Sequence, residues 1–316
     1  EDPRGDTRPW EVDLLPLVLG ADEWQWLSKA VAQRAELLDS VLGDLYGDQA
    51  LLKEGLMPPA LVYGQAGFQW PCQGIQPVSG RFLHLYAVDL ARAPDGGWWV
   101  MADRTQAPSG AGYALQNRLV ISRAFPAPFH NLPVTNLAEF FQGFQNSLAS
   151  MSPARNETAL CVLLTPGRFN ETYFEHVFLA RYLGLPLVEG QDLTVRDDTV
   201  YLKTLQGLRR VHAIYRRLDD GFCDPLELRA DSVLGIPGLL GAVRAGKVLM
   251  ANALGSGVLE SAALFGFLPE ISKKLLGSPL AMPSVASWWC GEKPALDYVI
   301  EHLDELVIKP AFASMR

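Results

Sequence analysis

The sequence has none of the closely spaced residue groups that mark the commonest metal and nucleophile sites. No CxxC pair and no His-x-x-x-His pair occurs among its 4 cysteines and 5 histidines, and no Gly-x-Ser-x-Gly segment is present. Zinc sites and thiol redox centres use such paired ligands, and α/β-hydrolases carry their serine in such a segment. The sequence therefore gives no support to a zinc enzyme, a thiol oxidoreductase or a serine hydrolase.

Positive charge and long hydrophobic runs are also scarce. Lys and Arg number 27 against 35 Asp and Glu, which gives a net charge of −8, so no broad basic field exists to attract nucleic acid. The apolar runs, such as residues 248–254, are too short to cross a bilayer, and the first residues show no signal-peptide core. We expect a cytoplasmic protein that binds neither nucleic acid nor membranes.

Hydrophobic residues make up 49% of 316 residues, which is enough for a large core divided between two or three structural units.

The first half of the chain predicts a long helix followed by a hairpin. Residues 22–46 place apolar side chains at helical spacing. After a loop rich in Gly and Pro, strand-like runs at 81–90 and 97–103 flank Asp95-Gly96. This dipeptide is typical of a tight hairpin, because both turn positions favour positive φ.

From about residue 156 strands alternate with helices. Strand-like runs lie at 160–164, 185–189, 211–216 and 247–251, and a helix at 172–183 ends at Gly184. Such alternation predicts a parallel sheet covered by helices. We predict a mixed α/β protein with a first part at 1–154, a Rossmann-like α/β unit at 155–265, and a last segment at 266–316 that ends in a strand at 306–310.

One segment combines a strand end, a glycine-rich loop and arginines. Asp103 ends the predicted second hairpin strand, and Arg104, Gly110 and Gly112 follow. Glycines let backbone N–H groups approach phosphate oxygens, a carboxylate can hold Mg²⁺, and arginines can neutralise transferred charge. A surface turn with a structural salt bridge from Asp103 to Arg104 or Arg118 explains the same residues equally well.

A second aspartate extends this segment. Asp89 ends the first predicted strand, so the hairpin could bring it beside Asp103. Two neighbouring carboxylates repel each other unless a cation lies between them. The pair is therefore a candidate metal site, although either aspartate alone is more often a solvated strand end.

Several motifs in order resemble those of the circularly permuted type 2 ATP-grasp proteins, which are similar in turn to glutathionylspermidine synthetase and more distantly to glutathione synthetase. The motifs lie at residues 82–89, 103–118, 170–176, 215–220, 252–260 and 307–310. The resemblance covers nearly the whole chain. It implies an ATP-grasp-like antiparallel sheet unit beside the Rossmann-like parallel sheet. It also implies an incomplete ATP-grasp fold, because family members continue well past residue 310, so we expect a fragment that need not be active alone.

The resemblance also implies an activity. ATP would phosphorylate a substrate carboxylate, and an amine would attack the acyl phosphate to give an amide. ATP and Mg²⁺ would be the cofactors, and small-molecule or peptide carboxylates and amines the substrates. Such chemistry requires positioning and charge neutralisation rather than a protein nucleophile.

Roles for single residues follow from the same resemblance. The metal ligands would be Asp89 and Asp103. The family usually has a Glu and an Asn where this chain has Asp103 and Thr105, which leaves the number of metal ions open. Arginines for the substrate carboxylate or the transferred phosphoryl group would be Arg104, Arg118 and Arg217. Residues for the nucleotide would be Ser109, Gly110, Gly112, Asn252, Gly255, Ser256 and Lys309.

One of these assignments has a plainer alternative, and one further residue is interpreted as structural. A tight connection between a strand and a helix explains residues 252–257 as well as an anion site does. Residue His176 lies on an apolar helix beside Glu175, so we interpret it as structural.

Two other functions stay open. The first is a non-catalytic nucleotide- or peptide-binding scaffold of the same fold. The second, a nucleotide-dependent oxidoreductase, has less support, because residues 165–170 lack the GxGxxG pattern.

Overall fold

A computed structural model describes residues 11–13, 15–154 and 157–312. The two ends of the chain, and with them the start of the predicted first part and the end of the third, lie outside these ranges. The chain forms two units. Unit 1 comprises Glu1–Leu19, Pro77–Ser79 and Ala107–Ala251, and unit 2 comprises Gly20–Gln76, Gly80–Gln106 and Asn252–Arg316. The predicted boundaries at 154 and 265 differ from these, since residues 107–154 group with the parallel sheet.

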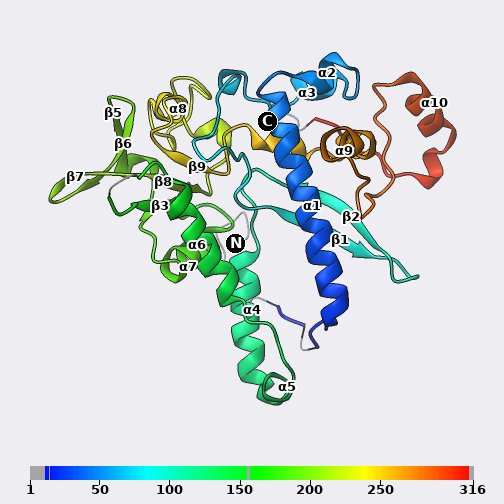
Figure 1. The fold of residues 1–316 in the computed structure, drawn as a ribbon, viewed down its shortest axis with the longest axis horizontal. Coiled ribbons are helices and arrows are strands. Elements are labelled where there is room, and N and C mark those ends of the chain that lie inside the picture. The colour runs from blue at the N-terminus through cyan, green and yellow to red at the C-terminus, as the bar shows by residue number, and fades with distance from the viewer. Residues whose placement is uncertain (1–10, 14, 155–156, 313–316) are drawn as a thin grey trace. The chain divides into compact units, whose positions relative to one another are not determined.

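Unit 2 is organised by one long helix and a hairpin (Figure 1). The predicted helix is α1 (Ala21–Leu45), and the hairpin consists of β1 (Ala87–Arg92) and β2 (Trp98–Arg104). The short helices are α2 (Ala50–Lys53), α3 (Pro59–Tyr63), η1 (Trp70–Cys72), η4 (Ser256–Glu260), η5 (Ala262–Leu264) and η6 (Leu303–Glu305). The later α-helices are α9 (Leu268–Leu276) and α10 (Lys293–Glu301).

The buried stripe of α1 explains its place in unit 2. Its fully or almost fully buried positions recur every three or four residues, as in one face of a helix, and they are Leu27, Ala30, Arg34, Leu37, Leu38, Val41, Leu42 and Leu45. The stripe faces α2, α9 and η4. Arg34 is the one charged residue in it.

The hairpin differs from its prediction in length and in its turn. The strand predicted from residue 81 begins at Ala87, because the backbone before it bonds to side chains rather than to β2. In the turn Gly96 has a φ of 87°, whereas Asp95 does not reach positive φ, so the expectation for both positions was wrong. On its other edge β2 forms an isolated bridge, since Val100 donates its N–H to the Pro283 carbonyl and its carbonyl accepts from the Val285 N–H.

Unit 1 contains the parallel sheet that the alternating pattern predicted. The sheet has the order β4-β3-β8-β9, all parallel. Its strands are β3 (Cys161–Leu164), β4 (Leu187–Val188), β8 (Ala213–Arg216) and β9 (Leu249–Ala251). A separate antiparallel sheet contains β5 (Leu193–Arg196), β6 (Thr199–Thr204) and β7 (Gly207–Arg210).

Helices pack on this sheet (Figure 1). Helix α6 packs on β8 and β9, and α7 packs on β3 and β4 and also on α4. The helices are α4 (Ala111–Ala124), α5 (Pro126–Asn131), α6 (Ala138–Met151), α7 (Tyr173–Tyr182), α8 (Leu239–Arg244), η2 (Gly190–Asp192) and η3 (Asp220–Phe222). Antiparallel and parallel sheets thus occur in one chain, which confirms the mixed α/β prediction.

The prediction of a strand at 306–310 was wrong. The segment after η6 is irregular, and no ladder hydrogen bond joins it to another strand in the part of the chain described. A strand is stable only where a neighbour satisfies its N–H and C=O groups. Separately, none of the described helices is both long and apolar enough to cross a bilayer.

Candidate functional site

The two hairpin aspartates lie on opposite faces of the hairpin. Asp89 is paired with Ala102, and Asp103 is paired with Val88. Paired residues share a face and successive residues alternate, so the two carboxylates point apart. Asp89 instead accepts a hydrogen bond from Arg104 at 2.8 Å, and both side chains are about half exposed. The structure therefore does not bring Asp89 and Asp103 together as the predicted pair.

Asp103 is buried and bound by an arginine from α1. Arg34 donates from Nε and Nη2 to the two carboxylate oxygens at 2.7 and 2.8 Å, and Tyr86 donates its hydroxyl at 2.5 Å. The side chains of Arg34 and Asp103 are 2% and 1% exposed. Burial would lower the pKa of Arg34, but the hydrogen bond and charge of Asp103 outweigh it and the pKa is raised. Burial, followed by the charge of Asp103, raises the pKa of Tyr86.

The backbone that follows Asp103 is fixed by Glu260. One oxygen of Glu260 accepts the backbone N–H groups of Thr105 and Gln106 at 2.7 and 2.8 Å. The Thr105 hydroxyl donates to the carbonyl of Ser256 at 2.7 Å. Thr105 and Ser256 are fully buried. Within unit 2 the end of β2 is thus bound to η4 at three points.

Asn252 uses its side-chain amide to join three backbone segments. Its oxygen accepts from the N–H groups of His84 and Leu85, and its nitrogen donates to the carbonyls of Leu85 and Thr105, all at 2.7 to 2.9 Å. An amide has two donor hydrogens and two acceptor lone pairs. These four bonds use the side-chain amide to organise the protein backbone, and the role of Asn252 toward a nucleotide stays a prediction from the sequence.

Gly255 and Ser256, two further predicted nucleotide residues, are packed inside unit 2. The Tyr46 hydroxyl donates to the Gly255 carbonyl at 2.9 Å, and a Cβ at Gly255 would lie 2.1 Å from that hydroxyl oxygen. The φ of Gly255 is 88°, which also favours glycine. This geometry matches the plainer alternative of a tight connection between a strand and a helix.

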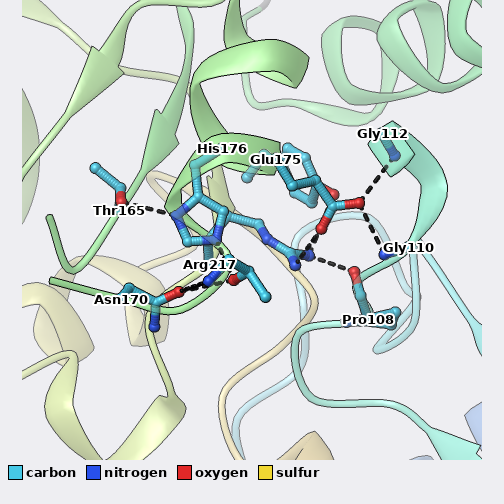
Figure 2. A network of polar contacts seen from close by, with 10 residues as sticks. Pro108, Gly110, Gly112, Thr165, Asn170, Glu175, His176 and Arg217 are labelled. Carbon is cyan, nitrogen blue, oxygen red and sulfur yellow. Dashed lines mark hydrogen bonds and ion pairs between the residues drawn. The ribbon is translucent and has the colours of Figure 1, made fainter. Parts of the chain in front are cut away.

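In unit 1, Glu175 binds the glycine-rich loop (Figure 2). One oxygen of its carboxylate accepts the backbone N–H groups of Gly110 and Gly112 at 2.7 and 2.8 Å. The other oxygen accepts from Arg217 at 3.1 Å, and Arg217 also donates to the Pro108 carbonyl. The side chains of Glu175 and Arg217 are 0% and 2% exposed. The two amides that the sequence assigned to phosphate therefore bind an internal carboxylate.

This arrangement follows from the local elements. Gly110 has a φ of 115° and precedes α4, whose first amides have no partner within the helix. Glu175 lies in the first turn of α7, which packs beside α4, and a carboxylate is favoured at a helix N-terminus. A Cβ at Gly112 would lie 2.8 Å from the Cγ of Glu175. Glycine at position 112 thus permits the close approach of the two helices.

His176 has a partner on each ring nitrogen. Thr165 Oγ1 lies 2.9 Å from Nδ1 and Thr172 Oγ1 lies 3.0 Å from Nε2. Thr172 donates its hydroxyl hydrogen to Asn170 Oδ1, so it accepts from Nε2–H, and Thr165 donates to Nδ1. Burial, with the charge of Arg217, lowers the pKa of His176 to about 3. The contacts, drawn in Figure 2, agree with a structural, neutral His176.

The other predicted residues differ in their exposure and in the contacts that they form. Ser109 is exposed. Arg118 donates to the Thr135 carbonyl at 3.0 Å, and its guanidinium lies over the Phe129 ring. Lys309 is exposed and forms no hydrogen bond or ion pair with any residue that the structure describes.

Sequence reasoning missed the partners of these residues. Arg34, Tyr86, Glu175 and Glu260 were not among the predicted site residues. A signal for Arg34 was present, because it occupies an apolar position of the α1 stripe, and a charge there requires a buried partner. The same holds for Glu175 on the apolar helix α7. Patterns along the chain give no comparable signal for Tyr86.

The described residues do not form a ready Mg²⁺ site. No group of three or more His, Cys, Asp or Glu side chains that could hold a metal ion occurs among them. Asp103 is occupied by Arg34 and Tyr86, and Asp89 by Arg104. The magnesium role of these residues stays a prediction from the sequence.

Comparison with known proteins identifies relatives over nearly the whole chain. A family model described as circularly permuted ATP-grasp type 2 matches residues 16–316. The uncharacterized protein sll0335 of Synechocystis sp. is 38% identical over 310 residues, which are 98% of this chain and 64% of that protein. The uncharacterized Mycobacterium tuberculosis proteins Rv2567 and Rv2411c are 40% and 37% identical over 95% and 98% of this chain. The chain spans 34% and 56% of their lengths, so it covers less than two thirds of these relatives.

Proposed function

Because the chain belongs to the circularly permuted ATP-grasp type 2 family, we propose that it forms part of an ATP-dependent ligase that joins a carboxylate to an amine. The terminal phosphoryl group of ATP passes to a carboxylate oxygen, the bond to ADP breaks, and an acyl phosphate forms. The amine nitrogen then attacks the carbonyl carbon, phosphate leaves and the nitrogen loses a proton. The substrates would be a small-molecule or peptide carboxylate and an amine.

The observation that carries the proposal is the anchoring of the family's signature segment. The segment at residues 103–118 begins in the Gly80–Gln106 stretch of unit 2 and continues into unit 1. In unit 2 its backbone is bound by Glu260, and in unit 1 by Glu175. Phosphoryl transfer is catalysed by positioning and charge, and a backbone fixed in advance suits that requirement.

The exposure of the predicted cationic residues indicates which of them is available to bind an anionic substrate. Arg217 is buried and bound to Glu175, so binding a substrate would require breaking a buried ion pair. Arg104 is half exposed and, in the part of the chain that the structure describes, is bound to the half-exposed Asp89. Surface ion pairs of this kind contribute about 0 to 1 kcal/mol. An anionic substrate can therefore displace Asp89 from Arg104. We propose Arg104 and the exposed Lys309 as the groups that bind anionic substrate, with Arg217 holding the loop.

ADP release by the full-length protein tests this function. ATP would be supplied with a panel of amino acids, dipeptides and polyamines, and one carboxylate and amine pair is expected to release ADP. Arg104→Gln should lower kcat/KM for that pair by about 10-fold or more. Arg244→Gln is the matched control, because Arg244 forms a similarly exposed pair with Glu227, and its kcat/KM should stay within about twofold. A folded protein that releases no ADP with any pair would contradict ligase activity.

The scaffold function has one observation in its favour. The amides of Gly110 and Gly112 that would bind phosphate are occupied by Glu175. A scaffold that retains the nucleotide site would show a higher Tm with ATP and Mg²⁺, yet no ADP release, in the same full-length preparation.

A further inference from the structure

Asp103 already accepts hydrogen bonds at most of its lone-pair positions. A carboxylate offers about four lone-pair positions. Arg34 takes one on each oxygen, and the Tyr86 hydroxyl takes a further one on Oδ1. Three of the about four positions through which a carboxylate would bind a cation are thus occupied.

Arg34 is also fixed in place by its own helix. It belongs to the buried stripe of α1, and its guanidinium lies 5.2 Å from the ring centre of Phe265. Its Nη1 is buried and has no hydrogen-bond partner among the residues described. An arginine that could turn toward water would satisfy this nitrogen, so the unpaired N–H indicates a side chain held by packing and by Asp103.

A divalent cation at Asp103 would therefore have to displace a buried guanidinium or lie beside it. The first leaves the arginine charge buried without its partner, and the second places two positive charges close together in a site of low exposure. The structure shows 2% and 1% exposure for the two side chains. Neither arrangement is favourable.

We propose that Arg34, and not a divalent cation, supplies the positive charge at Asp103. The pair is a built-in ion pair between α1 and β2, and any Mg²⁺ that accompanies a nucleotide is bound without Asp103. This inference does not depend on ligase activity, since it concerns metal binding alone.

Electron paramagnetic resonance of Mn²⁺ tests the proposal with the full-length protein and no nucleotide. Mn²⁺ is the probe because it is paramagnetic and prefers the oxygen ligands of Mg²⁺. The variants are Asp103→Asn, Arg34→Gln/Asp103→Asn, and the control Asp89→Asn on the other face of the hairpin. The double variant removes both charges and keeps hydrogen-bonding groups at both positions, so it guards against a single variant that fails to fold.

The expected result is that Mn²⁺ binding, whether weak or strong in the parent, changes by less than about twofold in the folded Asp103→Asn or double variant. A loss confined to Asp89→Asn supports the proposal as well, because it locates the metal on the opposite face. A loss of about 10-fold or more in folded Asp103→Asn and in the double variant, with Asp89→Asn unaffected, would overturn it. The Mn²⁺ measurement does not depend on ADP release. Failure of the ligase proposal can therefore be distinguished from failure of the proposal about Arg34 and Asp103.

Discussion

Each of the two units buries an arginine–carboxylate pair, Arg34–Asp103 and Arg217–Glu175, and these two pairs are built differently. In unit 2, Asp103 accepts only from side chains, namely both ends of the Arg34 fork and Tyr86. In unit 1, Glu175 accepts two backbone amides and only one bond from Arg217. Each arginine leaves one buried nitrogen without a hydrogen-bond partner in the described residues, Nη1 of Arg34 and Nε of Arg217.

The difference indicates what each carboxylate does. A bidentate pair between two elements stabilises their packing, so Asp103 belongs to the core of unit 2. A carboxylate that binds consecutive amides fixes the backbone path, so Glu175 determines the shape of the loop before α4. Loss of the first should therefore affect global stability, and loss of the second should affect the local order of residues 108–112.

The largest effect is expected for Arg34→Met. This change leaves Asp103 buried without its counter-charge, which costs about 3 to 5 kcal/mol. Unfolding in urea followed by tryptophan fluorescence measures it, because seven of the eight tryptophans lie in unit 2. Arg34→Met/Asp103→Leu should recover most of the loss. If the loss of unfolding free energy in the double variant equals the sum of the losses in the two single variants, the ion pair does not cause the instability of Arg34→Met.

A smaller and more local effect is expected for Glu175→Gln. The amide oxygen can still accept from Gly110 and Gly112, but Arg217 stays buried without a negative partner, which costs about 2 to 3 kcal/mol. Hydrogen exchange at the Gly110 and Gly112 amides should become faster than at amides in the middle of α4. Glu171→Gln, at an exposed position shortly before α7, is the control. Equal acceleration along α4 would mean that Glu175 stabilises the whole helix and not the loop.

Gly112→Ala should cost about 1 to 3 kcal/mol, because its Cβ would lie 2.8 Å from the Cγ of Glu175. Gly110→Ala meets no atom within 4 Å but has a φ of 115°, so strain of about 1 to 2 kcal/mol is expected there. Circular dichroism in urea gives the stability, and hydrogen exchange separates the causes. Only Gly112→Ala should loosen the first turn of α7, and the same response in Gly110→Ala would contradict the packing explanation.

The smallest effect is a pH dependence from His176. Its pKa of about 3 in the fold lies below the usual 6.5, so between these values the unfolded chain binds more protons and stability falls as pH falls. The slope approaches about 1.4 kcal/mol per pH unit below pH 6. His176→Gln should remove this part of the slope between pH 6.5 and 5. An unchanged slope would show that another group, such as the partly buried His84, causes it.

Local patterns predicted the elements but not their partners. Helix α1, the hairpin and the parallel strands follow from spacing within a few residues. The contact from Arg34 to Asp103 joins residues 69 apart in sequence, and the contact from Glu175 to Gly110 joins residues 65 apart. Spacing cannot show which distant side chain satisfies a buried charge, so Asp103 and the glycines were assigned to ligands. The wrong prediction of a strand at 306–310 has the same cause, since strand propensity does not supply a neighbouring strand.

The contact between Gly112 and Glu175 also limits how the sequence can diverge. A side chain at position 112 fits only if residue 175 loses the Cγ atom that lies 2.8 Å away, as in alanine, and a side chain at 175 that extends past Cβ as Glu175 does requires glycine at 112. Evolution would have to change these two positions in concert, although 62 residues of chain separate them. Covariation between positions 112 and 175 across related chains would indicate that the close approach of α4 and α7 has been kept during evolution.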